Sequence, residues 1–138
     1  MKGVNLVNLD ICGDERGSLI ALEGLSKQVP FEIKRVYYIF GTKPNVIRGK
    51  HAHYKLKQLL ICVSGSVDIL LDDGKNKDTI RLDSPDKGLY IDGFIWREMH
   101  NFSKDAVLVV LASDYYNEED YIRDYSKFLE EVKNSDNY

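Results

Sequence analysis

The sequence predicts an all-β domain of the sandwich or barrel type that ends in one amphipathic helix. About nine short stretches, alternating in polarity or rich in β-branched and aromatic residues, are separated by turns containing Gly, Pro, Asn or Asp, a pattern typical of such folds. No helical periodicity interrupts them before the last part of the chain. With 138 residues, 43% of them hydrophobic, the chain has the size and composition of one globular domain, spanning 1–138.

Three strands are expected in the first third of the chain. Residues 4–11 alternate loosely, residues 18–23 follow a polar turn, and residues 31–40 are rich in β-branched and aromatic side chains. The next segment, 41–49, contains two glycines and a proline and is therefore expected to be a loop.

Six further strands are expected after this loop. Residues 50–65 have the pattern of one long strand that ends at the Ser64-Gly65 turn, and Asp72-Asp73-Gly74 has the composition of a hairpin turn. The remaining strands are expected over 66–74, 77–84, two short segments on either side of Asp92-Gly93, and 105–113.

The end of the chain has a different period. Over residues 118–134 the apolar side chains recur at spacings of three and four, and acidic residues stand at the start, where a helix dipole favours them. This pattern predicts a helical tail that packs one stripe onto the domain. The stripe consists of Tyr121, Ile122, Tyr125, Phe128, Leu129 and Val132.

Charge and composition argue against several classes of protein. The net charge of -3 and the pI of about 5.6 leave no broadly basic face for nucleic acid or a membrane surface. No stretch approaches the roughly 20 apolar residues of a membrane span, and residues 1–11 lack the apolar core of a signal peptide. Cys12 and Cys62 have no metal-site spacing and are expected to be reduced thiols in or near the core of a cytoplasmic protein.

Two histidines separated by one residue, His51 and His53, are the first candidates for chemistry. In a strand, residues i and i+2 project from the same face, so both imidazoles are expected to enter one space. Such a pair could belong to a metal site, act as an acid/base pair, or pack as two satisfied core side chains.

The spacing after these histidines matches a known motif. The pair is followed after four residues by Gln58 and after six more by Gly65, the arrangement H-x-H-x(3,4)-E-x(6)-G found in cupins. A second cupin motif contains H-x(3)-N, and Arg97 and Asn101 occupy these two positions further along the chain. The sequence therefore resembles a single-domain cupin jelly roll with an added C-terminal helix.

Two departures from the motif argue against a metal. Metal cupins bind their ion through the two histidines, the glutamate and the second-motif histidine, and here Gln58 and Arg97 replace the last two. An amide is a weak ligand, and a guanidinium has no lone pair to donate and repels a cation. His100 falls on the opposite face of a regular strand from Arg97 and cannot replace it. Two imidazoles beside a fixed positive charge instead suit general acid/base chemistry, because a neighbouring cation lowers the pKa of each imidazole.

Five further segments carry a closer resemblance: RGSLIALE, PFEIKRVYYIF, RGKHAH, LDSPDKGLYI and, most specifically, LASDYYNEEDYIRDY. They are similar to the sugar-nucleotide 3,4-ketoisomerases, a family of cupins. The resemblance implies a homodimeric isomerase without metal or cofactor, which converts dTDP-4-keto-6-deoxy-D-glucose into a dTDP-3-keto-6-deoxyhexose through an enediol. It also implies a place in dideoxyaminosugar biosynthesis for cell-surface polysaccharide, before an aminotransferase.

The resemblance further implies roles for individual residues. His51 is expected to be the base that moves the carbon-bound proton, and His53 with Tyr37 is expected to relay protons between the two oxygens. Tyr37 is preferred to Tyr38 on the resemblance alone, since strand alternation cannot choose which face is inward.

The diphosphate of such a substrate requires cationic groups. A guanidinium binds two phosphate oxygens at once, so arginines near the motifs are expected at the pocket, and an amide suits a sugar hydroxyl. Two other functions are compatible with the same residues, a dTDP-sugar 3,5-epimerase and a non-catalytic sugar-nucleotide-binding cupin. The expected substrate-binding residues are Arg16, Arg35, Arg48, Gln58 and Arg97.

Overall fold

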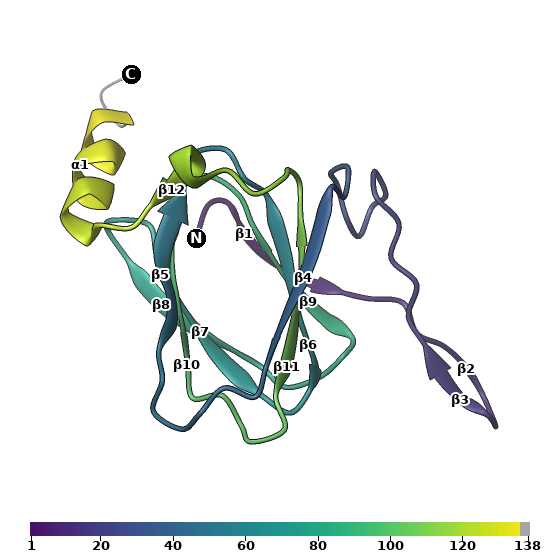
Figure 1. Cartoon of the computed structure of the whole chain (residues 1–138). Helices are drawn as coiled ribbons and strands as arrows, with labels where there is room; N and C mark the ends of the chain where they lie inside the picture. Colours follow the sequence, from purple (N-terminus) through teal and green to yellow (C-terminus); the bar gives the residue numbers. More distant parts are fainter. Residues whose placement is uncertain (136–138) are drawn as a thin grey trace.

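Two five-stranded antiparallel sheets lie face to face in the computed structural model, which describes residues 1–135 (Figure 1). Sheet neighbours are mostly distant in sequence, as in a jelly roll, and the fold class predicted from the sequence is confirmed. In spatial order the first sheet contains β1 (Val4–Asn8), β9 (Lys87–Ile91), β6 (Gln58–Ser64), β11 (Val107–Ala112) and β4 (Arg35–Phe40). The second contains β12 (Tyr121–Ile122), β5 (Arg48–His53), β10 (Trp96–His100), β7 (Val67–Asp72) and β8 (Lys77–Leu82).

The core between the sheets is formed by alternate residues of the strands. On β6, Leu60 and Cys62 belong to this core, whereas Leu59 and Ile61 belong to a second cluster on the outer face. The same alternation continues to the strand ends, so it decides which polar side chains enter the interior there. The buried core residues are Leu60, Cys62, Val67, Ile69, Leu71, Leu82, Leu89, Ile91, Ile95, Met99, Leu108 and Val110.

The prediction of a single strand over 50–65 is wrong. The structure divides this segment into β5 and β6, which belong to different sheets. The chain turns between them, and the Asp120 carboxylate stabilises the turn by accepting hydrogen bonds from the backbone N–H groups of Lys55 and Leu56 at 2.9 and 3.2 Å. A partner so distant in sequence leaves no local pattern. The turn brings the histidine motif and Gln58 to the site from opposite sheets.

The N-terminal strands are shorter than the sequence predicts. The first ends at Asn8, and the strand expected over 31–40 begins only at Arg35. The segment 18–23 contributes no more than the end of β3 (Gly17–Leu19), which pairs with β2 (Cys12–Asp14). This β2–β3 hairpin extends away from the two large sheets (Figure 1).

The helical tail begins later than predicted. Of the helix expected over 118–134, Glu118–Asp120 forms a 3-10 turn, Tyr121–Ile122 forms β12, and only Tyr125–Ser135 forms a helix, α1. β12 pairs with β5, because an open strand edge offers backbone hydrogen bonds to an extended segment. The predicted apolar stripe is therefore divided between a strand and a helix.

Helix α1 covers the outer face of β5 and β10. This packing supports β5 from the outside, and the inner face of β5 carries His51 and His53. Leu129, expected on the buried stripe, is instead 39% exposed. The buried residues of this contact are Ala52, Trp96, Ile122, Phe128 and Val132.

The two cysteines differ in environment. Both are free, and Cys62 is buried, but Cys12 is exposed. The prediction that Cys12 lies in or near the core is wrong, because its strand belongs to the projecting hairpin.

Within residues 1–135, no helix combines the length and the apolar composition needed to cross a membrane.

Candidate active site

One end of the space between the sheets is lined by polar side chains. β5, β10 and β12 of one sheet and β4 and β6 of the other contribute residues to it. On β4, Tyr37 is half-buried and packs against the core, whereas the side chain of Tyr38 is 63% exposed. Tyr37 and not Tyr38 therefore lies on the inner face of β4, which strand alternation alone could not decide. The inward polar side chains are Arg35, Tyr37, His51, His53, Gln58, Arg97 and Tyr121.

The two predicted histidines lie side by side. Their ring centroids are 4.8 Å apart, and the Tyr121 ring centroid is 5.0 Å from that of His51 and 4.3 Å from that of His53. Gly49 has a φ of +84°, which glycine adopts without strain, and its carbonyl accepts a hydrogen bond from Nδ1 of His51 at 2.9 Å. His51 therefore carries its proton on Nδ1 and keeps a lone pair on Nε2.

Burial keeps both imidazoles neutral. It lowers the pKa of His51 to about 4, and the nearby positive charge of Arg97 acts in the same direction. The pKa of His53 lies well below that of an ordinary histidine, first through burial and then through the charge of Arg97. At neutral pH both side chains are therefore proton acceptors.

Arg97 supplies a buried cation beside the histidines. It stands opposite His51 in the ladder between β10 and β5, and only 1% of its surface is exposed. Nε and Nη2 donate to the carbonyl of Ile95 at 3.1 and 3.0 Å, and Nη1 donates to Oε1 of Gln58 at 2.5 Å. Burial lowers the pKa of Arg97 to about 10, which leaves the guanidinium charged at neutral pH.

Gln58 connects this cation to Tyr37. Its Nε2 donates to the Tyr37 hydroxyl at 3.1 Å while its Oε1 accepts from Arg97, so each end of the amide has a partner within the protein. Burial raises the pKa of Tyr37. The phenol therefore stays protonated at neutral pH and can donate a proton to a bound ligand.

Two cavities border Tyr121. One of about 220 Å³ contains His53 in its wall, and one of about 320 Å³ contains His51. Arg35 and Tyr121 line both cavities and so lie between them. The smaller is further lined by Lys55, Leu56, Ser113, Asp114, Tyr115, Asn117 and Asp120. The larger is further lined by Tyr37, Ile39, Arg48, Gly49, Met99 and Arg123.

Three of the four arginines expected at the pocket lie there. The guanidinium carbon of Arg35 is 5.4 Å from the ring centroid of Tyr37, and its buried Nε has no hydrogen-bond partner in the described part of the chain. Arg48 lines the larger cavity, and Arg97 lies beside the histidines. The site thus brings together three cationic side chains, although the net charge of the chain is -3.

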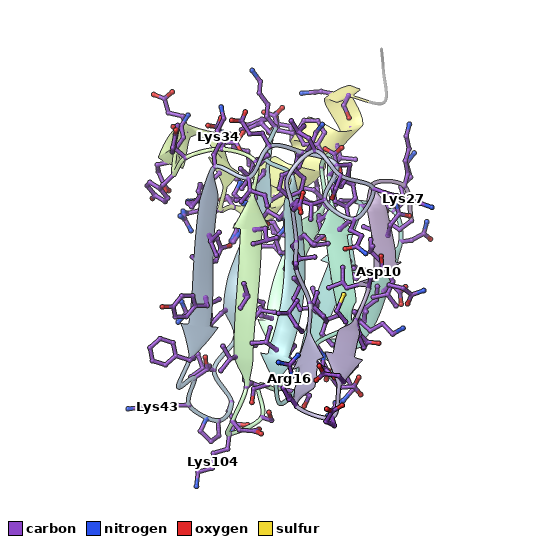
Figure 2. The ribbon with its side chains drawn as sticks, turned by 90° about the vertical axis from the view of Figure 1, so that its right-hand side faces the viewer. Asp10, Arg16, Lys27, Lys34, Lys43 and Lys104 are labelled. Carbon is purple, nitrogen blue, oxygen red and sulfur yellow. The ribbon has the colours of Figure 1, made fainter. Side chains whose placement is uncertain are left out.

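Arg16 is not brought to this site. It stands at the turn of the β2–β3 hairpin, with its side chain 85% exposed and Nη2 bonded to Oδ2 of Asp14 at 2.6 Å. Figure 2 shows Arg16 toward the end of the molecule opposite Lys34, the residue that precedes β4. Arg16 is therefore in contact with the hairpin turn and not with the interior of the domain.

A group of site residues that were not predicted lies in the segment expected to be helical. Besides Tyr121, this segment supplies Arg123, whose guanidinium carbon is 4.3 Å from the Tyr121 ring centroid and whose Nε pairs with Glu118 at 2.6 Å. It also supplies Asp120, which contacts His53. Residues 120–123, Asp-Tyr-Ile-Arg, do not alternate in polarity, so the sequence offered no period-2 signal for a strand here.

A jelly roll with an H-x-H pair and an inward second-motif residue at one end of its sheets defines the cupin class. The family model described as FdtA: WxcM-like, C-terminal, matches residues 2–133. Because this match covers nearly the whole sequence, the chain belongs to this family.

Characterised relatives confirm the resemblance to sugar-nucleotide ketoisomerases. The chain is 54% identical over 123 residues to the TDP-4-oxo-6-deoxy-alpha-D-glucose-3,4-oxoisomerase of Aneurinibacillus thermoaerophilus, covering 89% of this chain and 88% of that one. The structure of the WlaRB TDP-quinovose 3,4-ketoisomerase from Campylobacter jejuni is 58% identical, with a TM-score of 0.90 over 94% of this chain and 99% of that one. The H51N mutant of the 3,4-ketoisomerase QdtA from Thermoanaerobacterium thermosaccharolyticum, in complex with TDP-4-keto-6-deoxyglucose, is 43% identical, with a TM-score of 0.94 over 97% and 96% of the two chains.

Proposed function

We propose that this protein is an isomerase that converts dTDP-4-keto-6-deoxy-D-glucose into a dTDP-3-keto-6-deoxyhexose without a metal. The observation that carries the proposal is the pair of buried, neutral imidazoles of His51 and His53 beside the Arg97 cation, in a chain closely related to enzymes of this activity. The three relatives named above are all 3,4-isomerases, which favours this reaction over a 3,5-epimerase or a non-catalytic sugar-nucleotide-binding protein.

The reaction moves a carbonyl from carbon 4 to carbon 3 of the hexose. The lone pair on Nε2 of His51 removes the proton on carbon 3 while the oxygen on carbon 4 receives a proton, and an enediol results. The hydroxyl on carbon 3 then releases its proton, and His51 delivers the carbon-bound proton to carbon 4. His53 and Tyr37 relay the oxygen-bound protons. Atoms and electrons balance within the substrate, so the reaction consumes no cofactor.

The larger cavity suits the diphosphate of the substrate. Arg35, Arg48 and Arg123 line it, and their planar guanidinium groups can each bind two phosphate oxygens. Arg123 is paired with Glu118, so a diphosphate that binds Arg123 competes with this carboxylate. Arg16 can contact substrate only across a second copy of the chain, because its hairpin leads away from its own site.

A homodimer in the cytoplasm is part of the proposal. Leu19 of the hairpin and Phe40 of β4 are 59% and 68% exposed, and an apolar groove of about 340 Å³ lies between the hairpin segment and the outer face of the first sheet. Large exposed apolar surfaces of this kind mark protein contacts, and a second copy would cover them.

The free thiols suit a reducing compartment. A 3-keto product suits a later aminotransferase in dideoxyaminosugar biosynthesis for cell-surface polysaccharide.

The reaction is tested by proton NMR on dTDP-4-keto-6-deoxyglucose in heavy water with excess EDTA. We expect a 3-keto product at a rate within about twofold of that without EDTA, because the described residues hold no group of three His, Cys, Asp or Glu side chains that could bind a metal. The spectrum also reports the configuration at carbon 4. Deuterium entering carbon 5 would instead indicate an epimerase. Tight binding of the nucleotide sugar without deuterium exchange would indicate a binding protein. A loss of rate that added metal restores would contradict metal independence.

The dimer is tested by sedimentation. We expect the protein at micromolar concentration to sediment at twice the chain mass of 15.9 kDa, and Leu19→Asp to shift it toward the monomer, because the charge would be buried in the contact. Leu129→Asp, the same change at an exposed position of α1, is the matched control and should remain dimeric. A monomeric wild type would refute this part of the proposal.

A further inference from the structure

The carboxylate of Asp120 contacts three hydrogen-bond donors at the edge of the site. Oδ1 accepts from the backbone N–H of Lys55 at 2.9 Å, and Oδ2 accepts from that of Leu56 at 3.2 Å. Oδ2 also lies 3.2 Å from Nδ1 of His53, and 18% of the Asp120 side chain is exposed. This carboxylate therefore holds both the turn between β5 and β6 and one imidazole of the pair.

The contact with Asp120 determines which nitrogen of His53 carries the proton. An ionised carboxylate only accepts hydrogen bonds, so Nδ1 of the neutral imidazole donates and Nε2 keeps the lone pair. Nε2 is buried and has no hydrogen-bond partner among residues 1–135. A buried polar atom without a partner is costly, and the side chain borders the smaller cavity. The free nitrogen is therefore available to a ligand in that cavity.

The two histidines are oriented by different kinds of group. The carbonyl of Gly49 accepts from Nδ1 of His51, and a side-chain carboxylate accepts from Nδ1 of His53. Both arrangements leave Nε2 as the basic nitrogen. Only the arrangement at His53 depends on a side chain, so only there can a single substitution reverse the tautomer without altering the imidazole itself.

We propose that Asp120 is a positioning residue that holds His53 in its Nδ1–H tautomer, so that Nε2 accepts the oxygen-bound proton of the substrate during isomerisation. This role rests on the proposed ketoisomerase function. Asp120 acts through His53, because its oxygens are already engaged by His53 and the turn. Because the same carboxylate binds the turn and His53, formation of the turn also determines which nitrogen of His53 carries the proton.

Asp120→Asn tests the proposal, because an amide nitrogen in place of Oδ2 would donate to Nδ1 of His53, with loss of the hydrogen bond from the Leu56 N–H. We expect kcat to fall on the order of 10²-fold, the scale of one acid/base group, with KM within about threefold. Nitrogen-15 NMR of histidine-labelled protein should show the His53 proton move from Nδ1 to Nε2. Asp120→Glu keeps a carboxylate and should recover part of the lost kcat while preserving the Nδ1–H signal.

Asp73→Asn is the matched control. Asp73 also accepts hydrogen bonds from two backbone N–H groups of a turn, those of Lys75 and Asn76, but this turn joins β7 to β8 and holds no histidine. We expect its kcat and the His53 spectrum to remain those of the wild type.

Three results would overturn the positioning role. These are an Asp120→Asn enzyme with wild-type kcat, one whose kcat falls while His53 keeps the Nδ1–H signal, and a wild-type spectrum that already shows the Nε2–H tautomer. The last needs no variant, so it decides the matter even if Asp120→Asn does not fold. A wild type that shows the Nδ1–H tautomer but no isomerisation would instead refute the proposed function.

Discussion

His51→Asn is expected to lower kcat by about 10³-fold or more while leaving the affinity for TDP within about threefold of the wild type. An amide has no basic lone pair, so it cannot take the proton from carbon 3, and a positioned general base contributes about 10²–10⁴-fold. The asparagine amide can still donate toward the carbonyl of Gly49, which His51 contacts at 2.9 Å, so the local backbone should be kept. Turnover and TDP affinity are measured on the same preparation.

The matched control for this variant is His100→Asn. His100 lies on the opposite face of β10 from Arg97, where its Nε2 contacts Oε1 of Glu98 at 2.9 Å. We expect its kcat to stay within about twofold of the wild type, because it has no route to the interior. Full turnover by His51→Asn would exclude His51 as the carbon base.

Much of the site could be predicted because strand alternation is a local rule. The i, i+2 spacing of His51 and His53 places them on one face wherever the strand lies, and their ring centroids are indeed 4.8 Å apart. The cupin spacing located Gln58 and Arg97, and these two side chains meet in a hydrogen bond. The motif could not predict which face of β4 points inward, since both Tyr37 and Tyr38 fit the pattern of a strand.

The parts that could not be predicted depend on partners distant in sequence. Tyr121 has helical spacing to its neighbours, yet it is extended because the edge of β5 was open to pairing. The break between β5 and β6 depends on the Asp120 carboxylate, which binds the turn from the far end of the chain. Arg16 lies outside the site because its segment forms a hairpin that leaves the domain, and no residue type in that segment indicates this direction.

Arg97 has a second role besides its hydrogen bonds, because its charge acts on both histidines. The guanidinium is buried and lowers the pKa values of His51 and His53 in addition to burial itself. Removing the charge with Arg97→Met should therefore raise both pKa values toward the ordinary value. The substitution also leaves the carbonyl of Ile95 and Oε1 of Gln58 without their donor, a loss of about 1–3 kcal/mol each that the removal of a buried charge partly offsets.

Arg97→Met is consequently expected to move the acid limb of kcat/KM to higher pH. The limb reflects protonation of a base that must be neutral, so it should lie near pH 4, the pKa of His51, in the wild type and at higher pH in the variant. Relative to the wild type, the variant should thus lose more activity at acidic pH than at pH 8. Arg97→Lys keeps the charge but not the planar fork, so its limb should stay near that of the wild type while kcat falls at every pH. An Arg97→Met profile with an unshifted limb would show that burial alone keeps the histidines neutral, which would leave Arg97 a purely structural link to Gln58.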